Sequence, residues 1–531
     1  MRTRPSLPRP RPRTRPRSQA MAALGVVALL ATATSACDSE PAATSNSGAD
    51  RTLALSILGT PNSFDPAQLV EGQSTYVWDS IFDTLLLQDN KGELHPGAAQ
   101  SWSYSKDGLT LTLKLRAGMK FSSGATVDAN AVKATLERIR ATPGQSQQSL
   151  ASVSSVEAPD TSTVVIKLKQ PDSTLLASLS TAPGVIGDPK TMASKSTALN
   201  PVASGPYTLD TKATVNGSVY VLKRRDDYWN KKAYPFQTVK IRVITDPTAS
   251  ANALKAGETN AGTVDVSQLS ALKAAGFKIT HVQATAGAYL VLGDRAGTKL
   301  KPLGDLRVRK AINMAFDREK LVSQLLRGSG KATDQLFNPK DEAYDDALNS
   351  VYPFDVAGAK KLLAEAGYPD GFSVTMPSLV FTKSFEPIFT QALGDIGIKV
   401  TWEPVPAQQT VSAVSSGKYP MFLLVEGLNS DAIMTRSFYT PTGSRNVFHT
   451  TDPKLTTLLD KAARERDPAK SRGVYREINK FGVENAWVAP VFFIGSDWAT
   501  GKGITYLGDG ASTMSTIRQF GVTGSSQQSG G

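Results

Sequence analysis

Alternating apolar and polar residues divide the chain into predicted strands. The run LTLTLKL at 109–115 places every second side chain on one face, which is the pattern of a half-buried strand. Turn residues precede it at Asp107 and Gly108, and a second turn is expected at 89–92. Similar apolar runs predict further strands at 51–57, 163–168, 218–223, 238–244, 289–292, 373–376, 399–403, 421–425 and 488–493.

Apolar residues at helical spacing predict the helices. Val77, Ile81 and Leu85 recur every four positions and predict a helix within 76–87. Several other helices are expected to start at an aspartate, because its short side chain can accept hydrogen bonds from free N–H groups of the first turn. The predicted helices are 128–140, 248–256 and those capped by Asp305, Asp317 and Asp355, the last of which ends at Gly367. Residues 145–155 and 183–204 are expected to be irregular. Strands and helices mixed over about 480 residues favour α/β lobes.

The first 36 residues have the pattern of an export signal. Seven Arg and no acidic residue precede the uncharged apolar run at 20–33, which is too short to span a bilayer as a helix. Small residues follow, and then Cys37, the single cysteine of the chain. We predict a signal peptide at 1–36, a lipidated Cys37 and a flexible tether at 37–50. Thr34 stands where lipoprotein signals carry an aliphatic residue, so ordinary cleavage that leaves a free thiol is the alternative.

Composition excludes several classes of protein. The chain has 531 residues, 40% of them hydrophobic, which suggests about three domains or one large multi-lobed unit. Of its 59 basic residues, seven lie in the leader, so 52 face 47 acidic ones in the remainder. No basic run follows residue 50, and we expect no nucleic-acid partner. With one Cys and three scattered His, no metal site and no cofactor are predicted.

A search for catalytic motifs finds only weak matches. Ser103 and Lys106, and again Ser415 and Lys418, have the S-x-x-K spacing of penicillin-interacting enzymes, but the partner motifs of those enzymes are absent. We therefore assign no catalytic residue and expect a binding protein rather than an enzyme. An exported serine or carboxylate hydrolase that acts on peptides or cell wall is the alternative.

Several segments, taken in order, resemble one family. They are the Asp-Pro at 65–66, then 94–102 (LHPGAAQSW), 115–124 (LRAGMKFSSG), 204–207 (SGPY), 224–229 (RRDDYW), 307–313 (RVRKAIN) and 359–367 (AKKLLAEAG). This ordered set resembles the extracytoplasmic solute-binding proteins of ABC importers, family 5, the oligopeptide, dipeptide and nickel type. The resemblance covers roughly residues 51–500.

The resemblance implies an α/β, two-lobed periplasmic-binding-protein-like fold of type II, with an extra domain inserted in the first lobe. Lobe I would comprise 51–92, 201–288 and 496–521, the inserted domain 93–200 and lobe II 289–495, with a disordered tail at 522–531. It further implies capture of a peptide or peptide-like solute outside the cell by closure of the lobes, and delivery to an ABC permease with its ATPase subunits. The protein would be anchored by lipid to the outer face of the plasma membrane. A lipid-anchored peptide sensor on the same fold is another alternative.

By the same resemblance, four stretches line the cleft between the lobes. The residues expected to contact the ligand are Glu71, Gln73, Ser74, Thr75, Tyr289, Asp294, Glu426, Asn429, Asp431, Phe493 and Trp498.

The stretch 426–431 (EGLNSD) matters most among these. Peptide-binding relatives often have an aromatic residue there and an Asp that pairs with the α-amino group of the peptide. Val425 and Glu426 replace the first feature, and Leu428 or Asn429 takes the position of the Asp. Glu426 or Asp431 could still supply the counter-ion. Alternatively, both acids are solvated or pair with Arg436 or Arg445. The departure leaves modified peptides, other amines, metal chelates and sugars open.

Overall fold

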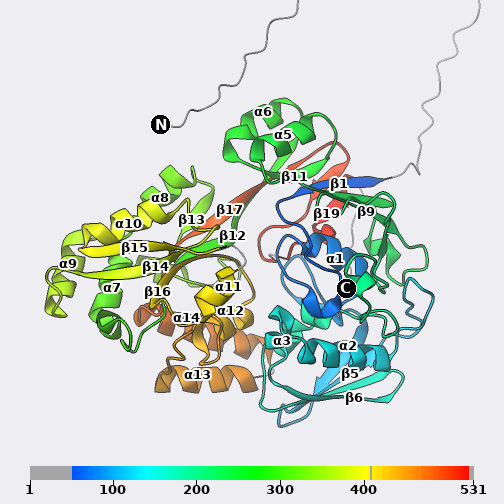
Figure 1. Cartoon of the computed structure of the whole chain (residues 1–531), viewed down its shortest axis with the longest axis horizontal. Helices are drawn as coiled ribbons and strands as arrows, with labels where there is room; N and C mark the ends of the chain where they lie inside the picture. The colour runs from blue at the N-terminus through cyan, green and yellow to red at the C-terminus, as the bar shows by residue number, and fades with distance from the viewer. Residues whose placement is uncertain (1–50, 407–408, 466, 513, 525–531) are drawn as a thin grey trace, which may run out of the picture. The chain divides into compact units, whose positions relative to one another are not determined.

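The computed structural model describes residues 51–406, 409–465, 467–512 and 514–524, whose arrangement is drawn in Figure 1. The predicted signal peptide, Cys37 and the tether lie outside these described residues, as does 525–531. Among the helices of the described ranges, none is long and apolar enough to cross a membrane.

One mixed sheet of nine strands organises the fold. Its order is β16-β12-β17-β11-β1-β10-β9-β8, and β13 pairs with β17 beside this path. β1 is parallel to β10 and β11, and the other pairs are antiparallel. The strands are β1 (Thr52–Ile57), β8 (Tyr207–Leu209), β9 (Val219–Arg224), β10 (Thr238–Val243), β11 (Ala261–Val264), β12 (Lys278–Leu292), β13 (Gly330–Ala332), β16 (Met421–Gly427) and β17 (Ala489–Thr500).

The long strands β12 and β17 join the two halves of this sheet. Near its C-terminus β17 pairs with β11, where Trp498 faces Thr263, and near its N-terminus it pairs with β13, where Phe493 faces Lys331. The register between β12 and β17 shifts after Val282. Such an irregularity interrupts the ladder and bends the strand. We call the part with β1 and β8–β11 the first lobe, and the part with β13–β16 and the helices from α7 onward the second lobe.

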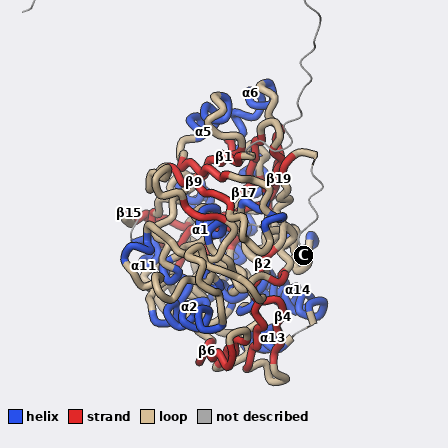
Figure 2. Tube along the Cα trace, turned by 90° about the vertical axis from the view of Figure 1, so that its right-hand side faces the viewer, coloured by secondary structure: helices blue, strands red, loops and turns tan. Residues whose placement is uncertain are grey.

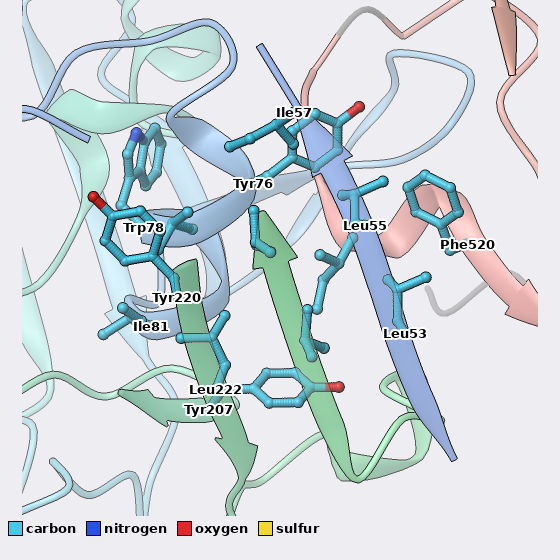
Figure 3. Close-up of a cluster of buried hydrophobic side chains, with 14 of the residues drawn as sticks. Leu53, Leu55, Ile57, Tyr76, Trp78, Ile81, Tyr207, Tyr220, Leu222 and Phe520 are labelled. Atoms are coloured by element: carbon cyan, nitrogen blue, oxygen red, sulfur yellow. The ribbon is translucent and has the colours of Figure 1, made fainter. Parts of the chain in front are cut away.

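The core of the first lobe lies between the sheet and α1 (Thr75–Ile81). Leu53 and Leu55 of β1 and Trp78 of α1 are fully buried there, and Figure 3 shows them with Tyr207 and Tyr220. The lobe is completed by α5 (Pro247–Lys255), α6 (Leu269–Ala274), β18 (Ile504–Tyr506) and β19 (Phe520–Val522).

A separate four-stranded sheet, in the order β4-β5-β7-β6, lies within 93–200. Its helix α2 begins where Asp128 accepts a hydrogen bond from Ala131 N at 2.9 Å, and α2 packs on β6 (Figure 2). The elements here are β3 (Leu94–Pro96), which pairs with the preceding β2 (Leu86–Gln88), and β4 (Ala99–Tyr104), β5 (Thr110–Leu115), α2 (Ala129–Ala141), α3 (Gln145–Ser149), β6 (Val153–Asp160), β7 (Thr163–Leu168) and α4 (Leu175–Ser178).

The second lobe packs helices on both faces of its strands, and two buried clusters form its core. The parallel pair β14–β15 lies beside α10. The elements are α7 (Leu306–Met314), α8 (Arg318–Leu325), α9 (Val356–Glu365), β14 (Phe372–Ser378), α10 (Glu386–Asp395), β15 (Ile398–Pro404), α11 (Thr410–Ser415), α12 (Asp431–Tyr439), α13 (Pro453–Arg464) and α14 (Pro468–Glu484).

Several sequence predictions fail in detail. The helix expected within 76–87 ends at Ile81, and Leu85 lies beyond it, because the chain turns to enter β2. The irregular stretch at 145–155 contains α3 and the start of β6. The strand at 289–292 is the end of the much longer β12. Val522, placed in the tail, belongs to β19. The predicted lobe boundaries otherwise stay a prediction.

Candidate ligand-binding site

Buried polar atoms without partners gather where the chain leaves β16 and begins α12. Among the described residues, Ser430 Oγ, Asp431 Oδ1 and Thr435 Oγ1 are buried and have no hydrogen-bond partner. Ser430 is the N-cap of α12, yet its side chain makes no capping bond. An unpaired buried polar group costs about 1–3 kcal/mol. Three of them at one helix end mark a place that a polar ligand can complete.

Asp431 lies beside a second carboxyl group, Asp341. Only 9% of Asp431 is exposed. Burial raises the pKa of Asp431 well above its usual value, and the charge of Asp341 raises it further. Burial raises the pKa of Asp341 to about 6, although its hydrogen bond with Asp431 offsets part of this effect. Two neighbouring carboxylates, one buried and one half-buried, repel each other, so the pair retains a proton or attracts a cation.

Tyr289 of β12 contributes a buried hydroxyl that also lacks a partner. Its ring packs edge-on against Phe438 of α12, with centroids 5.8 Å apart. The hydroxyl lies over Gly287, where an added Cβ would come within 2.0 Å of it, so a glycine is needed at 287. Burial raises the pKa of Tyr289, as does the charge of Glu426, and the hydroxyl therefore remains a neutral donor.

Glu426 is already paired within its own lobe. Arg445 donates from Nε to Glu426 Oε2 at 2.8 Å and from Nη2 to Oε1 at 3.0 Å. Burial lowers the pKa of Arg445, but the charge and hydrogen bond of Glu426 outweigh it and raise the pKa overall. A two-pronged pair of this kind satisfies the carboxylate. Of the two roles considered for Glu426 from the sequence, the structure therefore shows the pairing with Arg445.

Arg436 of α12 reaches from the second lobe to the inserted region. Its Nη1 donates to Thr174 Oγ1 at 3.0 Å and to Ser178 Oγ at 3.2 Å, and its Nη2 donates to Ser149 Oγ at 3.3 Å. Burial lowers the pKa of Arg436, while Asp172 and Glu71 counteract this effect. The Arg436 guanidinium therefore links α12 of the second lobe to the inserted region.

Two more residues extend this seam between the lobes. The Tyr475 hydroxyl of α14 forms a hydrogen bond with Ser173 Oγ at 3.1 Å. Burial raises the pKa of Tyr475, and the charges of Asp431 and Asp172 add to this rise. Glu71 lies on the first-lobe side, where burial raises its pKa and Thr181 and Arg436 partly offset that rise. We call Glu71, Asp341, Asp431, Arg436 and Tyr475 the interlobe site.

Three predicted ligand residues have structural surroundings instead. Asp294 is fully buried and accepts hydrogen bonds from Thr298 N and Oγ1, Lys299 N and Leu300 N at 2.6–2.9 Å, all within its own loop. Phe493 lies in a core cluster of the second lobe. Trp498 lies in the first-lobe core and stacks on Tyr506 with centroids 4.7 Å apart. Their side chains make these contacts within the fold, and a ligand contact for these three residues stays a prediction.

The remaining predicted residues flank the interlobe site. Ser74 Oγ donates to Val70 O at 2.8 Å, and Thr75 is buried at the start of α1. Gln73 Oε1 accepts a long bond of 3.4 Å from Leu58 N. Asn429 is half-buried in the loop before α12, where its side-chain amide donates to Gly427 O at 3.4 Å. For these four residues a ligand contact stays a prediction.

Sequence reasoning missed Asp341 and Tyr475, and it considered Arg436 only as a possible partner of the acids. Asp341 lies 90 positions before Asp431, in a stretch without strand or helix, and Tyr475 lies on a helix that was not predicted. A contact that joins such distant segments leaves no local pattern in the sequence. The sequence feature that did point to this site was the polar segment 426–431, which ends at the first residue of α12.

The weaker motifs are not assembled into sites. Ser415 Oγ donates to Val411 O, and Lys418 pairs with Glu403 instead. Among the described residues, Asp89, Glu93 and His95 form one group with ligand atoms close enough for a metal ion. The β2–β3 hairpin explains it, since Asp89 accepts from Lys91 N and Glu93 N and pairs with His95 Nε2 at 2.9 Å.

The fold and this site define a class: a two-lobed α/β binding protein of type II with an inserted domain. Solved structures support it. DppA from Helicobacter pylori in complex with the peptide STSA has a TM-score of 0.75 at 21% identity, over 89% of this chain and 98% of that one. AgaA from A. tumefacien R10 in complex with agropinic acid has a TM-score of 0.74 at 25% identity, with the same shares.

Residues 93–448 match the bacterial extracellular solute-binding proteins, family 5 middle. The chain therefore belongs to this family. The glutathione-binding protein GsiB of Salmonella choleraesuis is 29% identical over 460 residues, which are 80% of this chain and 86% of that protein. GsiB of Escherichia coli O1:K1 / APEC is 27% identical over the same lengths. Members of the family are extracytoplasmic binding proteins, and this chain is a substrate-binding component of an ABC importer.

Proposed function

We propose that the chain captures a peptide-like solute that carries a positively charged amino group, and that this group binds at the Asp341–Asp431 pair. The observation that carries the proposal is the buried Asp431 Oδ1, which has no hydrogen-bond partner. A carboxylate desolvated in this way needs a cation or donors, and an ammonium supplies both charge and N–H groups. The similarity to proteins named for glutathione binding, and to a binding protein in complex with a peptide, supports the peptide-like class.

Hydroxyls on and beside α12, together with Arg436 of the interlobe site, suit the other end of such a solute. Ser430, Thr435 and Tyr289 offer hydroxyls without partners, and each can donate to a carbonyl or carboxylate. Arg436 is held by neutral hydroxyls rather than by a close ion pair. Its guanidinium can therefore exchange one of these partners for a ligand carboxylate without breaking a salt bridge. The solute would then hold the lobes together from both sides.

The test begins with native mass spectrometry of the protein purified from its own host, which identifies a co-purified solute. Calorimetry with that solute, and with reduced glutathione and free tripeptides as probes, then compares the wild type with Asp431→Asn and Asp341→Asn. We expect a peptide-like solute with an amino group, and a loss of about 2 kcal/mol or more in either variant. A sugar or an anion without an amino group, or unchanged affinity in both variants, would overturn the proposal.

Glu426 gives a second, weaker arm of the same test. Its carboxylate is paired with Arg445, so Glu426→Gln is expected to change affinity less than Asp431→Asn does. A larger loss in Glu426→Gln would move the cationic subsite from Asp431 to Glu426.

We further propose that the protein acts by binding alone, without a catalytic step, and that it is a lipoprotein attached through Cys37. The basic leader, the apolar run and the small residues before the single Cys support export and lipidation. Globomycin-sensitive processing and loss of membrane association in Cys37→Ser are expected. Release of an unlipidated wild-type protein into the medium would contradict the proposed lipid anchor.

The proposal that the protein acts by binding alone has its own test. Labelling of Ser103 or Ser415 by a covalent serine probe would contradict it.

A further inference from the structure

A groove on the second lobe lies apart from the interlobe site. It has a volume of about 570 Å³ and is lined by Lys383, Glu386, Pro387, Thr390, Gln391, Gly394 and Trp402. Helix α10 supplies most of this lining, and β15, which lies along α10 in Figure 1, supplies Trp402. None of these residues belongs to the interlobe site. We call this feature the α10 groove.

The floor of the groove contains a carboxylate that the protein leaves unsatisfied. Glu386 is only 9% exposed, and its Oε1 is buried without a hydrogen-bond partner. Glu386 is the first residue of α10, where the helix dipole favours an anion. No N–H group of the helix donates a hydrogen bond to this oxygen. A buried acceptor of this kind is costly unless a ligand or water completes it.

An unpaired cation lies at the same groove. Lys383 is exposed, and among the described residues it forms no ion pair, not even with Glu386 three positions away. The groove thus presents one anionic and one cationic group that are separately available.

Trp402 forms an aromatic part of the groove, and Gly394 leaves space beside α10. Trp402 is half-buried, and its Nε1 donates to Thr390 Oγ1 at 2.8 Å, which holds the indole across α10. Gly394 has no heavy atom within 4 Å of an added Cβ, so packing does not require a glycine there. A glycine inside a helix costs about 0.5–1 kcal/mol relative to alanine. Its presence keeps the groove free of a side chain.

We propose that the α10 groove is a second binding site, which takes a small zwitterion. The ammonium group binds at Glu386, the carbon chain lies on the Trp402 indole, and the carboxylate points toward Lys383. An indole face attracts both an alkyl chain and a nearby cation, so it suits the middle of such a molecule. This site does not depend on the function proposed for the interlobe site.

The test uses ¹⁹F NMR of the full chain labelled with 5-fluorotryptophan, with the Trp402 resonance assigned through Trp402→Phe. Three matched probes are titrated: 4-aminobutyrate, butylamine and butyrate. We expect 4-aminobutyrate to shift the Trp402 resonance saturably at about millimolar concentration, and each probe with a single charge to bind about fivefold or more weakly. Glu386→Gln should remove the advantage of 4-aminobutyrate over butyrate, and Lys383→Gln its advantage over butylamine.

Two glycine variants separate the groove from general effects. Gly394→Leu fills the groove and should abolish the shift. Gly473→Leu adds the same bulk on α14, where an added Cβ also meets nothing within 4 Å, and should leave the shift unchanged. Thermal melting of each variant shows that the fold is retained. No saturable shift up to about 100 mM, equal shifts with all three probes, or a shift that survives Gly394→Leu would overturn the proposal.

Discussion

Asp294 and Asp431 lie at opposite ends of one antiparallel strand pair. Leu292 faces Met421 at one end of the β12–β16 ladder and Ala286 faces Gly427 at the other, so Asp294 follows the first end and Asp431 the second. Both aspartates are at least nine-tenths buried. The oxygens of Asp294 accept four hydrogen bonds from its own loop. Asp431 has a backbone hydrogen bond from Ala343 and a side-chain bond with Asp341, and its Oδ1 has no partner.

The pKa values follow this difference. Burial would raise the pKa of Asp294, but hydrogen bonds from Leu300, Thr298 and Lys299 together lower it below its usual value. Burial and the charge of Asp341 both raise the pKa of Asp431. Burial alone therefore does not distinguish an acid that holds the fold from one that can hold a ligand. The supply of donors from the protein does.

The largest expected effect is a loss of stability on substitution of Asp294, whose oxygens accept hydrogen bonds from its own loop. Asp294→Ala should lower the free energy of unfolding by about 3 kcal/mol, because it removes a fully buried carboxylate and leaves three backbone N–H groups at 298–300 without their acceptor. Asp431→Asn should lower it by less than about 1 kcal/mol or should raise it. Urea unfolding of both variants at neutral pH measures the difference. If Asp431→Asn is destabilised as much as Asp294→Ala, the contrast between the two ends is wrong.

Ligand affinity should show the opposite order. With the co-purified solute, Asp431→Asn is expected to weaken binding by about thirtyfold or more, because a desolvated charge contact is lost. Asp460→Asn is the matched control, since this exposed aspartate lies on α13 of the same lobe, and its affinity should remain that of the wild type. Calorimetry provides both values. Equal losses in the two variants would indicate a general electrostatic effect instead of a site.

The pH dependence of stability tests the carboxyl pair in the ligand-free protein. Because the folded pKa values of Asp341 and Asp431 are raised, the native state binds more protons than the unfolded chain above about pH 4. Stability should therefore fall as the pH rises from about 4 to above 6, by about 1–3 kcal/mol from this pair.

Asp431→Asn should flatten that slope. Burial also raises the pKa of Asp83 to about 6, so part of the slope will remain in the variant. Unfolding curves collected from pH 4 to 8 measure it. If stability rises with pH in the wild type, or if Asp431→Asn leaves the slope unchanged, the Asp341–Asp431 pair does not cause the pH dependence.

The smallest effect on affinity is expected at Arg436. This residue links the second lobe to the inserted region, whereas Asp294 and Asp431 lie at the ends of the β12–β16 ladder. Arg436→Gln removes hydrogen bonds to three hydroxyls, and should weaken solute binding by about three- to tenfold. Small-angle scattering of the ligand-free variant should give a larger radius of gyration than the wild type. An unchanged radius with unchanged affinity would limit Arg436 to a local contact.

Local sequence patterns were sufficient for many elements. Asp128, Asp305, Asp317 and Asp355 each accept a backbone hydrogen bond at the start of a helix, as the N-cap pattern predicts. Alternation correctly placed β5 and β7. By contrast, α10–α14 were not predicted, and the long strand β12 was recognised only at its apolar end. Its first half contains several polar residues, with Thr280 and His281 next to each other, and shows no apolar run.

The candidate site was predictable only in part, and the reason is geometric. Tyr289 and Asp431 were named from the segment they belong to, and both carry unpartnered polar atoms near α12. Asp294 was named because it follows the same strand as Tyr289. The strand ends where Leu292 pairs with Met421, so Asp294 lies at the other end of the ladder from Asp431, and its ligand contact stays a prediction.

By itself the sequence determined the class of protein, the capped helices, the alternating strands and an acidic segment at 426–431. These features depend on residues close together in the chain, and on an ordered set of motifs that survives at low identity. Only the tertiary structure decided which acid is free, because donors to a carboxylate come from wherever the chain folds back. Thr298, Lys299 and Leu300 satisfy Asp294, Arg445 satisfies Glu426, and Asp431 lies beside Asp341 with one oxygen that has no partner.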